Sequence, residues 1–238
     1  MTNLRLVNVA VMNSAVKTDS DVVLVESPGR VPFAEIHQHM LDLQAELGTA
    51  VDSDLRQRVL LFEPSPVVTL GSGAQGENSI LEEAKLSQHG IDRYSVDRGG
   101  EATYHGPGQL LAYPVIQLQE HERDLHVLLR NLEEAILLTL GDWNIEGQRD
   151  EDNTGVWVGD SKIASVGLSV RRWVTGHGLA LYVSGNQEPF QWIIPCGLKN
   201  CKITTMESLL GSSVEIPAVE ARLKFHLLNL LNRTEVSS

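Results

Sequence analysis

The sequence contains little of what membrane, secreted or disulfide-rich proteins require. Among its 238 residues there is no apolar run close to the roughly 20 residues of a membrane helix. Residues Met1 to Arg5 lack the charged-then-apolar pattern of a secretory signal, and they are not the Arg/Ser-rich stretch of a transit peptide. The two cysteines, Cys196 and Cys201, are too few for a disulfide scaffold. We therefore expect a cytoplasmic protein with reduced thiols and no association with a membrane.

Positive charge is also scarce, with 19 Lys and Arg residues against 31 Asp and Glu, a net charge of -12. This balance argues against nucleic-acid binding, which favours a basic face. The stretch 153–206 differs, because its five basic and two acidic residues give it a charge of +3. That local excess is either a chance fluctuation on a solvated surface or a docking patch for an acidic partner.

The remaining composition, 42% apolar and 21% charged, is ordinary for a globular protein with a buried core. Hydrophobic periodicity and turn residues predict helices at 32–47, 79–88, 123–140 and 218–231. They predict strands at 4–12, 22–26, 59–62, 67–70, 91–96, 110–118, 156–158, 162–170 and 179–183, with Pro114 at an edge or bulge. Because the strands occur in neighbouring runs, we expect an α+β fold with a mixed, largely antiparallel sheet flanked by helices.

The segment from Gly71 to Gly76 matches the G-x-G-x-x-G pattern of dinucleotide-binding proteins and lies between a predicted strand and a predicted helix. In such proteins the next strand is buried on both faces and continuously apolar. Here the next strand, 91–96, alternates between apolar and polar residues. We therefore interpret Gly71 to Gly76 as a flexible surface loop and expect no dinucleotide cofactor.

The segment from Arg98 to Gln109 is rich in glycine and also contains Arg98, Thr103, His105 and Gln109. Glycines let backbone N–H groups approach a ligand closely. A tight surface turn would explain the glycines but not Arg98 and His105 on either side of them, so a binding loop is favoured. His105 is a candidate base, hydrogen-bond donor or structural residue. Without a second ligand at suitable spacing, no metal site is expected.

Cys196 lies between Pro195 and Gly197, directly after the apolar pair Ile193-Ile194. Most cysteines are buried hydrophobic residues, but this position combines the end of a strand with a sharp turn, which exposes a thiol to a substrate. Cys201 is interpreted as incidental. A thiol with a pKa of about 8.5 needs an activating partner at neutral pH. His105, His177 and Lys162 are all candidates, and the residues alone do not choose among them.

Four elements together resemble the lipoyl(octanoyl) transferase family: 98–109, 162–167, 177–180 and 195–198. The similarity extends from about Thr69 to Met206. The resemblance implies the fold of biotin and lipoate protein ligases and one catalytic domain over residues 1–238. One departure is visible, because Tyr182 stands where the family usually has Asn.

The resemblance implies that Cys196 is the nucleophile that carries the acyl group as a thioester and that Lys162 lowers its pKa and handles protons. It also implies an acyl-binding site made of three segments: Arg98, Gly99, Gly100, Glu101, Ala102, Thr103, Tyr104 and His105; Ser165, Val166 and Gly167; and Gly178, Leu179 and Ala180. The donor would be octanoyl-acyl carrier protein. The acceptors would be lipoyl domains of 2-oxoacid dehydrogenase complexes and the glycine-cleavage H protein, with no cofactor and no metal. The alternative on this fold is an ATP-dependent lipoate or biotin ligase.

Overall fold

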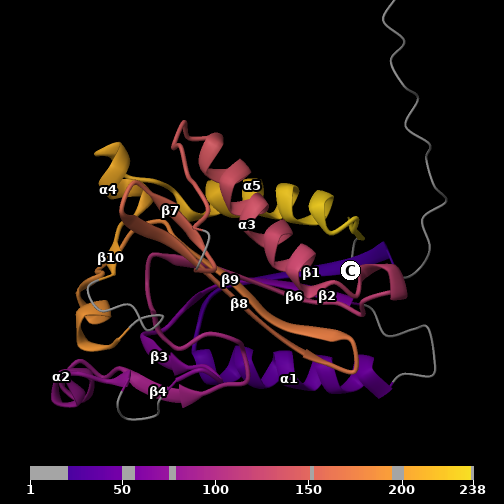
Figure 1. Ribbon diagram of the computed structural model, residues 1–238, viewed down its shortest axis with the longest axis horizontal. Coiled ribbons are helices and arrows are strands. Elements are labelled where there is room, and N and C mark those ends of the chain that lie inside the picture. The colour runs from indigo at the N-terminus through magenta and orange to yellow at the C-terminus, as the bar shows by residue number, and fades with distance from the viewer. Residues whose placement is uncertain (1–20, 50–56, 75–78, 151–152, 195–200, 237–238) are drawn as a thin grey trace, which may run out of the picture.

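Two β-sheets with helices packed against them make up the computed structural model, which describes residues 21–49, 57–74, 79–150, 153–194 and 201–236 (Figure 1). The predicted strand 4–12 and the predicted nucleophile Cys196 lie outside these residues. The predicted α+β class is confirmed.

In the described part of the chain, the larger sheet has the strand order β10-β8-β9-β6-β2-β1-β11, and β7 pairs with β8. The ladders β2/β6, β6/β9, β8/β9 and β7/β8 are antiparallel, whereas β1/β2, β1/β11 and β10/β8 are parallel. The strands are β1 (Val22–Val31), β2 (Gln57–Pro64), β6 (Gln109–Val115), β7 (Val156–Val158), β8 (Ser161–Arg171), β9 (Val174–Tyr182), β10 (Lys202–Ile203) and β11 (Thr234–Glu235). The sheet is therefore mixed and antiparallel at its centre, as predicted.

The smaller sheet has the order β4-β3-β5, built from β3 (Val67–Leu70), β4 (Asp92–Ser95) and β5 (Ala102–His105). Strand β4 lies at its edge, which explains the alternating pattern at 91–96. Strand β5 was not predicted, because it lies inside the glycine-rich segment.

Helices cover both faces of the larger sheet (Figure 1). Helix α3 (Leu125–Gly141) and α5 (Ile216–Leu230) pack on one face around a core that includes Leu132, Ile136 and Leu223. On the other face lies α1 (Phe33–Thr49), the helix predicted at 32–47, which buries an apolar stripe of Phe33, Ile36, Met40, Leu43 and Leu47. Helix α3 begins after Asp124, whose carboxylate accepts hydrogen bonds from the N–H groups of His126 and Val127.

The remaining elements are short: α2 (Glu83–Gln88), η3 (Glu120–Glu122), η4 (Glu188–Trp192) and α4 (Met206–Leu210). The predicted helix 79–88 is thus reduced to α2. Pro114 lies in β6, opposite Val59 of β2, but the ladder between β6 and β9 ends at Ala112. Pro114 therefore lies in a central strand and not at the predicted edge or bulge, but beyond the end of the β6/β9 ladder, where its missing N–H interrupts no hydrogen bond to β9.

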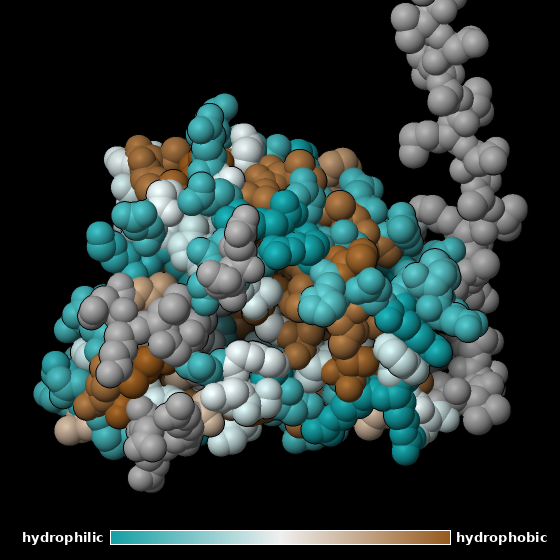
Figure 2. All heavy atoms as spheres, in the orientation of Figure 1, coloured by the Kyte–Doolittle hydropathy of each residue, from teal (hydrophilic) through white to brown (hydrophobic). Residues whose placement is uncertain are grey.

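Large exposed apolar residues are scattered over several elements, including Leu81, Val127 on α3, Trp173 and Phe225 on α5. On the face in Figure 2, hydrophobic patches are separated by hydrophilic residues. Among the described residues, no helix is both long enough and apolar enough to cross a membrane.

Candidate functional site

A cavity with an empty volume of about 750 Å³, its open mouth included, lies between the glycine-rich segment and the larger sheet. Its lining contains Lys162 and all the predicted acyl-binding residues except Tyr104. Three segments that are far apart in the sequence are thus brought together. The cavity also has four lining residues that were not assigned to binding: Tyr113, Asn153, Thr154 and His177.

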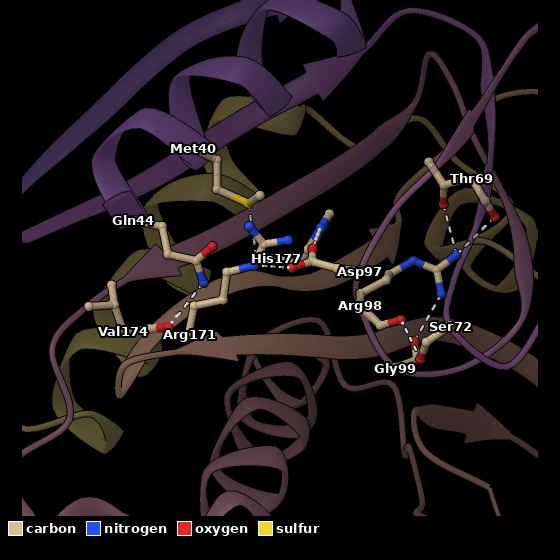
Figure 3. A network of polar contacts seen from close by, with 10 residues as sticks. All are labelled: Met40, Gln44, Thr69, Ser72, Asp97, Arg98, Gly99, Arg171, Val174 and His177. Carbon is tan, nitrogen blue, oxygen red and sulfur yellow. Dashed lines mark hydrogen bonds and ion pairs between the residues drawn. The ribbon is translucent and has the colours of Figure 1, made fainter. Parts of the chain in front are cut away.

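The guanidinium group of Arg98 holds the glycine-rich segment in place (Figure 3). Its Nη2 donates to the carbonyl and hydroxyl oxygens of Thr69 at 3.0 and 2.8 Å and to the carbonyl of Glu101 at 2.9 Å. Its Nη1 donates to the carbonyl of Gly99 at 3.0 Å. Arg98 therefore ties the segment to the end of β3. The residue is buried, with 8% of its surface exposed.

Among the described residues of Gly71 to Gly76, Ser72 and Gly73 are exposed in a turn, as expected of a surface loop, but the backbone of this loop is hydrogen-bonded to the binding segment. The N–H groups of Gly71, Ser72 and Gly73 donate to the carbonyls of Glu101, Arg98 and Gly100 at 2.9 to 3.1 Å. Gly71 is buried, and a Cβ atom there would collide with the carbonyl of Gly100. The glycines at 71 and 73 thus serve close backbone packing against the binding segment rather than a nucleotide.

The same segment rests on β8. The N–H of Gly99 donates to the carbonyl of Leu168 at 2.9 Å. Across this contact, a Cβ atom on Gly167 would lie 3.0 Å from the Gly99 carbonyl oxygen, closer than ordinary packing allows. Gly167 therefore permits the approach of backbone to backbone that closes this side of the cavity.

Lys162 is 2% exposed and lies in β8 between β7 and β10. Its Nζ is 4.8 Å from the centre of the Trp157 ring, a cation–π distance. The Lys162 side chain therefore does not extend into solvent. Strict alternation breaks at this point, so Lys162 and Ala164 do not lie on one face of β8. The β7/β8 register shifts between Val156 and Trp157, and consecutive residues Ile163 and Ala164 both pack into the core beneath α3.

Both candidate histidines line the same cavity as Lys162. His105 is 5% exposed, its Nδ1 is 3.2 Å from Gln109 Oε1, and burial together with the charge of Arg98 lowers its pKa to about 3. His105 is therefore neutral and a weak base at neutral pH.

His177 is tied to Asp97, which in turn binds Arg171 (Figure 3). The distances are 3.2 Å from His177 Nε2 to Asp97 Oδ1 and 2.9 Å from Arg171 Nε to Asp97 Oδ2. Burial lowers the pKa of His177, and the hydrogen bond from His177 lowers the pKa of Asp97 to about 2. This arrangement holds a neutral imidazole in one orientation in the cavity wall.

Tyr104 is the one predicted binding residue that the cavity does not include. Its ring packs edge-on against Phe190 of η4, with the ring centres 5.6 Å apart. It also covers Gly106, where a Cβ atom would collide with the phenol. Tyr104 is thus a packing residue beneath the site.

Cys196 falls in 195–200, outside the described residues. The described chain on both sides is anchored: Ile194 N–H donates to the carbonyl of Ser79 at 2.8 Å, and Lys202 pairs with Ser161 next to Lys162. Six positions after Cys196, the chain is therefore adjacent to the strand that carries Lys162.

Two residues that line the cavity, Asn153 and Thr154, were not predicted to do so. They lie just before β7, and no motif in the sequence marks them. Tyr113 was read only as part of a strand. Within the described ranges, no group of three or more His, Cys, Asp or Glu side chains is arranged to hold a metal ion.

Comparison with known proteins first defines the class. The family model of the lipoyl protein ligase A/B catalytic domain matches residues 37–228. The fold is similar to lipoate-protein ligase A bound with ATP, with a TM-score of 0.66, 15% identity, and coverage of 91% of this chain and 90% of that one. It is also similar to the biotin protein ligase of Aquifex aeolicus in complex with biotin and ATP, with a TM-score of 0.54, 13% identity, and coverage of 87% and 70%. At such identities the similarity concerns the fold, and it confirms the fold that the resemblance implied.

Curated relatives narrow the class. The octanoyltransferase of Caldicellulosiruptor saccharolyticus is 42% identical over 77% of this chain and 79% of its own length. That of Solibacter usitatus is 41% identical over 86% and 90%. The chain therefore belongs to the octanoyltransferase family and is an acyltransferase.

Proposed function

We propose that this protein transfers an octanoyl or lipoyl group from acyl carrier protein to a specific lysine of a lipoyl domain, with Cys196 as the acyl carrier on the enzyme. The observation that supports it is the cavity in which buried Lys162 meets the three glycine-containing segments. Such a cavity, apolar in part and closed by backbone, suits a short acyl chain with a reactive carbonyl near a lysine. We further propose that residues 1–238 act as one catalytic domain.

The proposed reaction has two half-reactions. In the first, the Cys196 thiolate attacks the octanoyl carbonyl, the bond to the phosphopantetheine sulfur breaks, and Lys162 gives a proton to the departing thiolate. In the second, the acceptor lysine attacks the acyl-enzyme, neutral Lys162 takes up its proton, and the Cys196 thiolate leaves as the amide forms. Because a thioester is already activated, neither ATP nor a metal or cofactor is required.

The proposed acceptors are lipoyl domains of 2-oxoacid dehydrogenase complexes and the glycine-cleavage H protein, and the proposed location is the cytoplasm. The basic excess at 153–206 suits an acidic carrier protein as donor. The family membership favours a transferase over the ATP-dependent ligase, which would not need Cys196.

Intact-mass measurement after incubation with octanoyl-acyl carrier protein tests the proposal. We expect an octanoyl adduct on the wild type and on Cys201→Ser, the matched thiol control, but none on Cys196→Ser. Lys162→Ala should form the adduct and pass it on much more slowly, by a factor of about 100 or more. Turnover that strictly requires ATP would instead establish a ligase. A wild type that binds octanoyl groups but never forms an adduct would indicate an acyl-binding module.

A further inference from the structure

Glu133 is a carboxylate in the middle of α3 that is 0% exposed. Leu132 and Ile136 of the same helix belong to the hydrophobic core. Burying an acidic side chain costs several kcal/mol unless it is well paired. A buried carboxylate at this position therefore requires cations or hydrogen-bond donors beside it.

The partners of Glu133 lie on two sides. Its Oε2 accepts from Arg130 Nη1 at 2.7 Å and lies 3.3 Å from Arg149 Nε, so two guanidinium groups balance the charge. Its Oε1 accepts from the backbone N–H of Gly155 at 2.9 Å. Glu133 thus fixes the backbone just before β7, although Gly155 is 22 residues away in the sequence.

Gly155 lies directly against the Lys162 side chain. A Cβ atom on Gly155 would be 2.7 Å from Lys162 Cε, 3.3 Å from Nζ and 2.5 Å from the Ala164 carbonyl oxygen. Its φ of +130° also disfavours any other residue. Two residues further on, the Trp157 ring faces the ammonium group at 4.8 Å. The segment from Gly155 to Trp157 therefore packs against the Lys162 side chain, and Glu133 holds its first residue.

We infer that Glu133 is a positioning residue for Lys162: through Gly155, it sets the place of the ammonium group at the end of the cavity. Asn153 and Thr154, which also line the cavity, come from the same segment. The inference rests on the proposed role of Lys162 as the proton-transfer group. A displacement of about 1 Å at such a group costs on the order of 100-fold in rate.

A comparison of kcat and KM for octanoyl transfer separates positioning from a purely structural role. In Glu133→Met the acceptor of the Gly155 N–H is lost, and we expect kcat per folded molecule to fall at least about tenfold with KM changed less than about twofold. Glu133→Gln keeps an oxygen acceptor and should recover most of that loss. Folded fractions are determined by circular dichroism.

Two controls match these variants. Glu122 accepts from Arg233 at 2.7 and 2.9 Å outside the cavity, so Glu122→Met removes an ion-paired carboxylate without touching the Lys162 site. Gly155→Ala leaves Glu133 in place but pushes a methyl group toward Lys162, and it should lower kcat as Glu133→Met does. Gly159→Ala is its control, because Gly159 also has a positive φ but open space around it.

The outcomes are distinguishable. If Lys162→Ala turns over as fast as the wild type, the proposed proton-transfer role fails, and with it the basis of this inference. If Lys162→Ala is impaired while folded Glu133→Met keeps wild-type kcat, the positioning role of Glu133 is overturned and the proposed function stands. Equal losses of kcat in Glu133→Gln and Glu133→Met would also overturn it.

Discussion

The phenolic oxygen of Tyr182 lies 2.5 Å from the hydroxyl oxygen of Ser165. Tyr182 is fully buried, with its ring 5.3 Å from that of Phe190, and it does not line the cavity. Ser165 does line it. Tyr182, which lies behind the cavity wall, thus holds one of the hydroxyl groups that line the cavity.

We expect Tyr182→Phe and Ser165→Ala each to lower the free energy of unfolding, because each removes one partner of a largely buried hydrogen bond. In the double variant the losses should be smaller than their sum, with a coupling of about 1 kcal/mol. Urea unfolding of the four proteins in this double-mutant cycle measures the coupling. Strict additivity would show that the contact contributes nothing to stability.

The four hydrogen bonds of Arg98 lead to a second prediction. Lysine carries its donors on one atom and does not reproduce the planar fork that reaches Thr69, Gly99 and Glu101 together. Arg98→Lys should lower the free energy of unfolding by about 2 kcal/mol and raise KM for the acyl donor.

The matched control is Arg93→Lys, since the Arg93–Glu83 ion pair at 3.1 Å is exposed. There we expect a change below about 0.5 kcal/mol in urea unfolding. Arg98→Lys with wild-type stability and KM would contradict the bracing role of Arg98.

Helices and strands were predicted correctly where the spacing of their own apolar residues is enough to specify them. The apolar stripe from Phe33 to Leu47 has helical spacing and forms α1, since one buried face is enough to specify a helix. The segment from Arg98 was interpreted as a binding loop from its own residues, and the other two binding segments were predicted from the family resemblance. The fold brings all three to one cavity.

Features that depend on distant backbone were missed. The segment that begins at Gly71 was interpreted as a flexible loop. Its packing against Gly100 was not foreseen, because the two glycines are about 30 residues apart in the sequence. The orientation of Lys162 depends on a shifted register between β7 and β8, which the residues of β8 alone do not reveal. Glu133 was not singled out, because nothing in its own segment indicates a hydrogen bond to Gly155.

A third prediction concerns the basic excess at 153–206. Arg171 is engaged with Asp97, so the exposed Arg172 is the cleaner probe of a docking patch. Arg172→Glu should slow encounter with acyl carrier protein about threefold or more at low salt, and the difference should vanish near 0.5 M salt. Stopped-flow association rates test this. Lys224→Glu on α5 changes the net charge equally, so an equal effect there would point to overall charge instead of a patch.

Burial of His105 makes the stability of the protein dependent on pH. Its pKa is about 3 in the folded protein, against 6.5 for an unperturbed histidine. Between these values the unfolded chain binds a proton that the folded chain does not, so the free energy of unfolding falls as pH decreases from 6.5 toward 3. The lowered pKa values of His37 and His177 act in the same sense. Asp97, with a pKa of about 2, adds a further loss only below pH 4.

We expect His105→Gln to be less stable than the wild type at pH 7.5, because its contact with Gln109 is altered, but to lose less stability on acidification. Each proton taken up only on unfolding contributes at most about 1.4 kcal/mol per pH unit. From pH 6 to 4.5, the variant should therefore lose about 2 kcal/mol less than the wild type. Urea unfolding at four pH values gives the slopes. His126→Gln, at an exposed position on α3, should follow the wild-type slope, and a His105→Gln slope equal to it would show that His105 is not the group responsible.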